Sequence, residues 1–138
     1  MTTEQNKVLA ERIPLELSKG NLGVLDEVVD PKAVDHAVPP GMPPTLESTK
    51  QILGMFRAAF PDLTYTIEFS VAEGDRVMQR VTARGTMKGD FMGMKATAKS
   101  ATWTESHIVR IDNGKVVEHW ANLDQVGMLQ QLGLMPGA

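Results

Sequence analysis

The sequence predicts an α+β fold in which helices cover one face of a strongly curved antiparallel sheet. Apolar residues recur at helical spacing in the first third of the chain, and from residue 63 onward they alternate with polar residues, as in strands. Helices followed by a run of strands are typical of α+β proteins. A strongly bent sheet with helices over its mouth forms a cone-shaped barrel, so we expect an apolar pocket inside it.

Two helices and a short strand are expected before the first proline-rich loop. The spacing of apolar residues predicts a helix over 4–17, which Pro14 should kink or break because proline lacks an amide donor. A second, shorter helix is expected over 22–29 and should end before the next proline. A short strand over 33–38 then leads into a rigid loop over 39–44.

The rest of the chain is predicted to be one helix, four strands and a last short helix. The third helix is expected over 46–60, with Thr45 as its N-cap and Pro61 after its end. The segment 87–94 holds two glycines and three methionines, which predicts a mobile flap between strands. The four strands are expected over 63–71, 76–86, 97–111 and 115–123, and the last helix over 125–132.

The composition excludes several classes of protein. With 138 residues, 42% of them hydrophobic and 22% charged, the chain has the composition of an ordinary globular domain. Its net charge of -3 offers no basic surface for phosphates, so nucleic acid is not an expected partner. The lack of cysteine excludes disulfides, thiolate metal sites and cysteine nucleophiles. Because no stretch is apolar enough for a signal peptide or a spanning helix, we expect a cytoplasmic protein without a membrane partner.

Three stretches of the chain resemble the SnoaL-like polyketide cyclase family. They are Ala-Phe-Pro-Asp-Leu at 59–63, Gly-Thr at 85–86 with Gly89 and Phe-Met-Gly at 91–93, and the run from Arg110 to Trp120 with Asp124 and Leu-Gln-Gln-Leu-Gly at 129–133. The resemblance implies one domain over 1–138, with the cone-shaped α+β barrel of the nuclear-transport-factor-2 type. It also implies a homodimer or homotetramer, and a pocket that closes a polyketide ring by an intramolecular aldol reaction without cofactor or metal.

The turn at 112–114 decides which side chains share a face, because a shift of one residue flips a whole strand. A two-residue turn would pair His107 with Trp120, whereas a three-residue turn would pair His107 with His119 and Glu105 with position 121. The resemblance favours the second register, since the family's catalytic aspartate aligns with position 121 and a family histidine aligns with His107. On this reading one face carries Trp103, Glu105, His107, His119 and Ala121.

Two positions depart from the family pattern. Ala121 stands where the resemblance places the catalytic aspartate, and alanine cannot transfer a proton. Met87 stands where many family members carry a histidine, and it makes the pocket mouth more apolar. Glu105, expected opposite Ala121 with Cβ atoms about 4.5 to 5.5 Å apart, would place a carboxylate near the missing one. Natural divergence or deliberate substitution would produce the same two departures.

The predicted site combines acid/base groups with an apolar lining. A carboxylate in an apolar pocket beside an imidazole is suited to move a proton in enolisation, aldol closure, isomerisation or ring opening. The residues expected to be catalytic are Glu105, His107, His119 and Asp124. The residues expected to contact a hydrophobic small-molecule substrate are His36, Met55, Phe60, Met87, Phe91, Trp103 and Ala121. No metal site or cofactor is expected, because the sequence has no ligand-spacing motif and no phosphate-binding loop.

Structural roles compete with each of these assignments. Glu105 and His107 could form a polar pair at a subunit interface, and His119 could be a hydrogen-bonded residue beneath the helices. Asp124 precedes the last helix, where it could be an N-cap, and His36 could be an ordinary surface residue. For the whole chain, the alternative to an enzyme is a non-catalytic binding protein.

Overall fold

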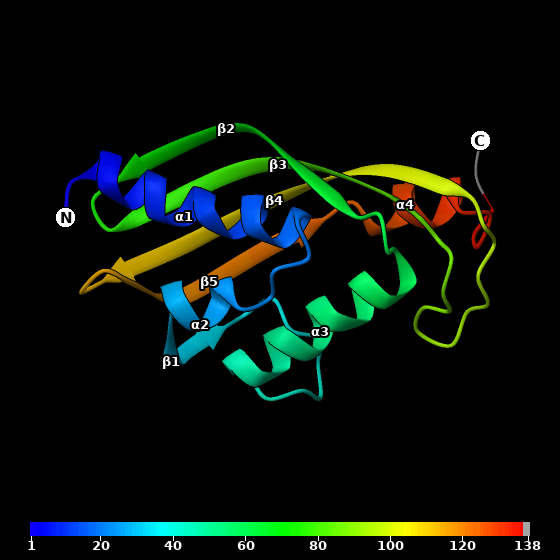
Figure 1. The fold of residues 1–138 in the computed structure, drawn as a ribbon, viewed down its shortest axis with the longest axis horizontal. Helices are drawn as coiled ribbons and strands as arrows, with labels where there is room; N and C mark the ends of the chain where they lie inside the picture. Colours follow the sequence, from blue (N-terminus) through cyan, green and yellow to red (C-terminus); the bar gives the residue numbers. More distant parts are fainter. Residues whose placement is uncertain (137–138) are drawn as a thin grey trace.

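The computed structural model describes residues 1–136, which form four helices and five strands (Figure 1). The helices are α1 (Thr3–Ser18), α2 (Val24–Val28), α3 (Leu46–Ala59) and α4 (Gln125–Gln131). The strands are β1 (Val29–Asp35), β2 (Thr64–Glu73), β3 (Arg76–Thr86), β4 (Ser100–Asp112) and β5 (Lys115–Leu123). The last two residues of the expected domain lie outside the described part of the chain.

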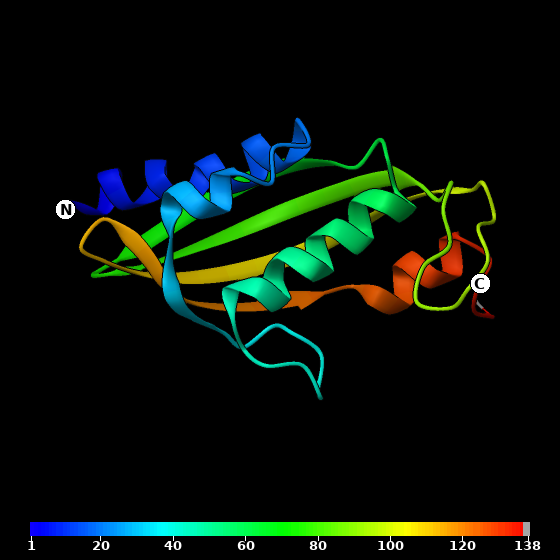
Figure 2. The ribbon, with the colours of Figure 1, turned by 60° about the horizontal axis from the view of Figure 1, so that its bottom comes forward.

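The strands form one curved sheet in the order β1-β5-β4-β3-β2 (Figure 2). All neighbouring pairs are antiparallel except β1 and β5, which run parallel. The sheet does not close, since β1 and β2 are its two edges. Helix α1 packs along β2 and β3, and α3 packs against β1, so both lie over the same inner face. The predicted α+β class with a curved sheet and covering helices is confirmed.

The first helix continues through Pro14 as one unit of 16 residues, so the predicted break does not occur. Pro14 is buried, and the Oγ of Ser18 donates a hydrogen bond to its carbonyl oxygen. The first strand starts earlier than expected and includes Pro31. Proline is tolerated there because β1 is an edge strand. The predicted N-cap of α3 is confirmed, since the Thr45 side chain accepts a hydrogen bond from the Ser48 amide. Within residues 1–136, none of the helices is both long and apolar enough to cross a membrane.

The hairpin between β4 and β5 differs from the register that the resemblance favoured. Asn113 and Gly114 form a two-residue turn with φ of 51° and 73°, and a bulge follows at the Arg110/Ile111 step. The bulge adds one residue to β5 and so restores the predicted face. Glu105, His107, His119 and Ala121 therefore share the inner face as expected. The expected cross-strand pairs are wrong, because His107 pairs with Ala121, Val109 with His119, and Glu105 with Leu123.

The segment expected to be a mobile flap folds into a compact loop. Phe91 and Met94 form a β-bridge around a turn in which Met92 and Gly93 have positive φ. The Phe91 ring lies 4.8 Å from Phe56 and 5.9 Å from Phe60, measured between centroids. The segment is packed structure and not an open flap because Phe91 fills a core cluster, Gly93 serves the turn, and Gly89 lets the loop approach the carbonyl of Ala58.

Candidate active site

A cavity of about 170 Å³ lies between the inner face of the sheet and helices α1 and α3. Most of its lining is aliphatic, from residues such as Ile13, Leu53 and Val81. Polar side chains reach it chiefly from the strands. They are Asp35, Thr49, Tyr65, Gln79, Glu105, His107 and His119. An apolar cavity with a few polar groups on one wall is typical of a small-molecule site.

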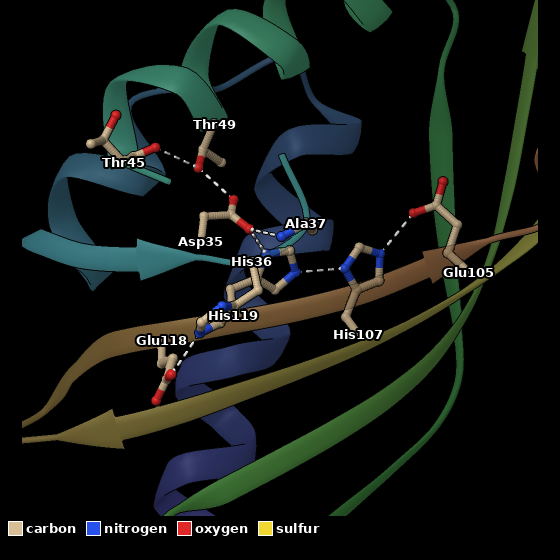
Figure 3. A network of polar contacts seen from close by, with 9 residues as sticks. All are labelled: Asp35, His36, Ala37, Thr45, Thr49, Glu105, His107, Glu118 and His119. Atoms are coloured by element: carbon tan, nitrogen blue, oxygen red, sulfur yellow. Dashed lines mark hydrogen bonds and ion pairs between the residues drawn. The ribbon is translucent and has the colours of Figure 1, made fainter. Parts of the chain in front are cut away.

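Four of these side chains form an unbroken chain of hydrogen bonds (Figure 3). Glu105 Oε1 lies 2.7 Å from His107 Nε2. His107 Nδ1 lies 2.9 Å from His119 Nε2, and the two rings are stacked with an angle of 13° between their planes. His119 Nδ1 lies 2.9 Å from Asp35 Oδ1. The chain thus has a carboxylate at each end and two imidazoles between them.

The two carboxylates at the ends of this hydrogen-bonded chain, Glu105 and Asp35, are buried and accept further hydrogen bonds. The Glu105 side chain is 5% exposed, and its Oε2 accepts a hydrogen bond of 2.8 Å from the Trp103 indole. Asp35 accepts hydrogen bonds from the Ala37 amide and the Thr49 hydroxyl. Burial alone would raise the pKa of Asp35, but the hydrogen bond and charge of His119, with these other donors, hold that pKa below its usual 3.8.

The hydrogen-bond partners of these four side chains indicate where the protons between them lie. Asp35 is an acceptor for all its neighbours, so His119 Nδ1 is an N–H donor. The two imidazole nitrogens that face each other need one proton between them, because two lone pairs or two N–H groups would repel. A third proton lies between His107 Nε2 and Glu105 Oε1. With these three protons, either Glu105 is an acid beside two neutral imidazoles, or it is a carboxylate and one of the two imidazoles is an imidazolium.

The geometry favours hydrogen-bond relay over metal coordination. Each ring nitrogen of His107 and His119 already faces a partner within the chain. Across residues 1–136, no three His, Asp or Glu side chains converge as metal ligands do. The arrangement can accept a proton at Glu105 and redistribute charge over the two imidazoles.

The structure brings four of the predicted site residues to the cavity. They are Glu105, His107, His119 and Ala121. Phe60, Met87, Phe91 and Trp103 instead pack in a core cluster with Met128 of α4, at the end of the sheet beyond the cavity. Met55 lies on α3 outside the cavity lining and is 44% exposed.

Two other predicted site residues have structural partners. Asp124 caps α4, where its side chain accepts a hydrogen bond from the Gly127 amide. His36 lies away from the cavity, stacked on Trp120 at 5.1 Å between centroids and 2.7 Å from Glu118. The competing structural roles of Asp124 and His36 are therefore the ones that the geometry supports.

Sequence reasoning missed Asp35, Thr49, Tyr65 and Gln79. Asp35 ends β1 and is 6% exposed, which is unusual for a carboxylate. Gln79 lies between Val77 and Val81 on the inner face of β3 and is also 6% exposed. A polar residue in phase with buried apolar residues of a strand is the signal that could have found Gln79, whereas β2, which holds Tyr65, has no buried residue. Thr49 offers no such signal.

Several residues that carry the resemblance have structural roles in this chain. Asp62 accepts hydrogen bonds from both the backbone amide and the hydroxyl of Thr86. The hydrogen bond from the amide is the main cause that lowers the pKa of Asp62. A Cβ atom on Gly85 would lie 3.0 Å from the Phe60 side chain. The Gln131 side chain bonds both the amide and the carbonyl of Thr102. These residues stabilise the structure beside the cavity and do not line it.

Comparison with known proteins finds relatives described as cyclases. The family model described as SnoaL-like polyketide cyclase matches residues 8–132. Aklanonic acid methyl ester cyclase DauD of Streptomyces sp. (strain C5) is 27% identical over 111 residues, which are 80% of this chain and 67% of DauD. Among solved structures, IdmH of Streptomyces antibioticus, suggested to be a polyketide cyclase, is 34% identical with a TM-score of 0.84, over 94% of this chain and 99% of IdmH.

A second structural neighbour carries a different suggested activity. AclR of Streptomyces galilaeus, suggested to be a hydroxylase, is 26% identical with a TM-score of 0.90, over 99% of this chain and 86% of AclR. Proteins with this fold are thus described as catalysing different reactions, so the reaction has to be assigned from the site itself. The family model covers most of the chain, and the predicted resemblance is confirmed. The chain belongs to the SnoaL-like polyketide cyclase family.

Proposed function

We propose that this protein catalyses cofactor-independent proton transfer on a hydrophobic carbonyl compound, leading to ring closure of a polyketide-type substrate. The observation that carries the proposal is the hydrogen-bonded chain from Glu105 through His107 and His119 to Asp35, which lies along an apolar cavity. The cyclase relatives DauD and IdmH support the reaction class.

Glu105 is the proposed base. All four ring nitrogens of the histidine pair are occupied by partners, whereas each carboxylate oxygen of Glu105 has a second lone pair. Glu105 would remove a proton from the carbon beside a substrate carbonyl, and the C–H electron pair would move to form an enolate. The enolate carbon would attack a second carbonyl carbon of the same molecule, and the new alkoxide would take the proton back. Atoms and charge balance without an added reagent.

The position of Glu105 compensates for Ala121 in this proposal. Ala121 pairs directly with His107, and Glu105 reaches the same imidazole from two residues along β4. The imidazole that an aspartate at position 121 would contact therefore has a carboxylate partner in this chain. A cavity of about 170 Å³ is similar to engineered cavities that hold one aromatic ring, so a larger substrate would extend beyond it.

The test is turnover by the parent protein and by Glu105→Gln over pH 5 to 9. Two substrates are suitable: a cyclic ketone whose α-hydrogen exchange in D₂O is followed by NMR, and aklanonic acid methyl ester, the compound named for DauD. We expect Glu105→Gln to lower the rate roughly 10²- to 10⁴-fold, the range for loss of an acid/base group. The matched control is Glu118→Gln, because Glu118 lies on β5 outside the cavity lining and should leave the rate unchanged.

Two results would overturn the proposal. If the parent binds the ketone but exchanges no α-hydrogen, the protein is a binder and not an enzyme. If the parent is active and Glu105→Gln is equally active, the carboxylate is not the base.

A further inference from the structure

Gln79 and Tyr65 are polar cavity-lining residues that take no part in the hydrogen-bonded chain, and Gln79 is the one nearer to its histidines. It lies on the inner face of β3, directly across from His107 in the β3–β4 pairing. Residues paired in this way have Cβ atoms about 4.5 to 5.5 Å apart. The Gln79 amide is therefore beside the imidazole that contacts the proposed base.

The Nε2 group of Gln79 is buried without a hydrogen-bond partner among the described residues. The residue is 6% exposed, so more than nine-tenths of it is removed from solvent. An unpaired buried donor is destabilising, and such groups are rare in native proteins. A methionine or leucine would fill the same space at lower cost, so the amide points to a ligand that accepts its hydrogen bond.

The other polar groups on this wall offer few alternatives as donors. The indole of Trp103 and the hydroxyl of Thr49 already donate to Glu105 and Asp35. The ring nitrogens of both histidines are engaged within the chain. Among the cavity-lining side chains of residues 1–136, this leaves the Gln79 amide and the hydroxyl of Tyr65 to meet a ligand oxygen.

We infer that Gln79 is a substrate-contacting residue whose Nε2 donates a hydrogen bond to the carbonyl oxygen that becomes the enolate oxygen. This inference rests on the proposed function, because it assumes that Glu105 removes a proton beside a carbonyl. A donor fixed where negative charge develops stabilises the transition state more than the ground state. Gln79 and Glu105 would then act on the same carbonyl unit of the substrate, Gln79 on its oxygen and Glu105 on the hydrogen of the neighbouring α-carbon.

Two variants separate this role from a structural one. Gln79→Met keeps a similar length and removes the donor and the unpaired polar group. Gln79→Glu keeps the shape and replaces the amide nitrogen by oxygen. We expect Gln79→Met to slow α-hydrogen exchange roughly 10²-fold, as for loss of one oxyanion donor. Its melting temperature should equal or exceed that of the parent, because no internal hydrogen bond is lost.

A binding measurement gives a readout that does not depend on turnover. The probes are 2-naphthol, whose ionised form mimics an enolate and is seen by absorbance, and naphthalene, which has no oxygen. We expect both Gln79 variants to bind naphthalene like the parent and to hold at least 10-fold less naphtholate. Tyr65→Phe serves as the comparison for the other available donor.

The outcomes are distinguishable. If Glu105→Gln is inactive but both Gln79 variants keep parental exchange and naphtholate binding, the Gln79 inference is wrong and the proposed function stands. If Tyr65→Phe alone loses naphtholate, Tyr65 is the donor and Gln79 is not. If the parent exchanges no α-hydrogen and binds neither probe, the proposed function fails and the inference fails with it.

Discussion

His107 Nδ1 lies 2.9 Å from His119 Nε2, although the two residues are not cross-strand partners. His107 pairs with Ala121 and His119 with Val109, so the imidazoles meet diagonally across β4 and β5. The small side chain of Ala121 leaves room beside His107. The bulge in β5 provides the alignment, because without it His119 would point to the outer face.

Asp35 should act as a positioning residue through His119. It fixes the His119 tautomer, which in turn orients the proton between the two rings. We expect Asp35→Asn to lower kcat roughly 10-fold, leave KM nearly unchanged and shift the pH profile, because the change reaches Glu105 only through the histidines. The ¹⁵N chemical shifts of the His119 ring should report a changed tautomer, which a purely structural role would not produce.

The same substitution predicts a pH-dependent loss of stability. The pKa of Asp35 is lower in the folded chain than its usual 3.8, so ionised Asp35 stabilises the fold above that pH. This contribution, about 1–3 kcal/mol, is lost as the pH falls through the folded pKa. Urea unfolding should show Asp35→Asn less stable than the parent at pH 7, and the difference should shrink as the pH falls below 3.8. A constant difference at all pH values would contradict this, and the exposed Asp112→Asn is the control.

The spacing of apolar residues predicted much of the fold but less of the candidate site. Period-two alternation identified β2, because alternation is a local property, whereas the shared inner face of β4 and β5 was predicted from the family resemblance. The pairing of Glu105 with Ala121 was wrong because a bulge is set by packing of the whole sheet. The aromatic residues near Phe91 were assigned to the ligand, although they fill a second core. Asp35 was missed because it joins the site through a parallel pairing of β1 with β5, between segments far apart in sequence.

Restoring the family carboxylate at position 121 tests whether Glu105 replaces it. Ala121 lines the cavity directly across from His107, so an aspartate there would contact the same imidazole. We expect the double variant Glu105→Gln with Ala121→Asp to be at least 10-fold more active than the single variant Glu105→Gln. Steady-state kinetics at matched pH measures the recovery. If Ala121→Asp is active while the parent is inactive, the parent is a binder or a disabled cyclase.

The expected homodimer or homotetramer stays a prediction, and the outer face of the sheet is where the structure suggests testing it. Val71, Met78, Ile108 and Trp120 are successive cross-strand partners, so they form an apolar row across β2, β3, β4 and β5. Val71 is 52% exposed and Ile108 is 38% exposed. A second copy of this chain could bury that row. We expect sedimentation velocity to show a homodimer or larger assembly that Ile108→Glu weakens, while Thr66→Glu on β2 does not. A parent that is monomeric at all concentrations would refute this.

Two glycine substitutions should have opposite effects on stability. A Cβ atom on Gly85 would lie 3.0 Å from Cβ and Cδ1 of the Phe60 side chain, which is itself fully buried. Neither group can move freely, so we expect Gly85→Ala to lower the free energy of unfolding by about 1–3 kcal/mol. Gly54 lies inside α3 with no atom within 4 Å of the added Cβ, so Gly54→Ala should raise stability by up to about 1 kcal/mol through helix propensity. Urea unfolding measures both, and the contact of Gly85 with Phe60 would be shown unimportant if the two variants changed stability in the same direction.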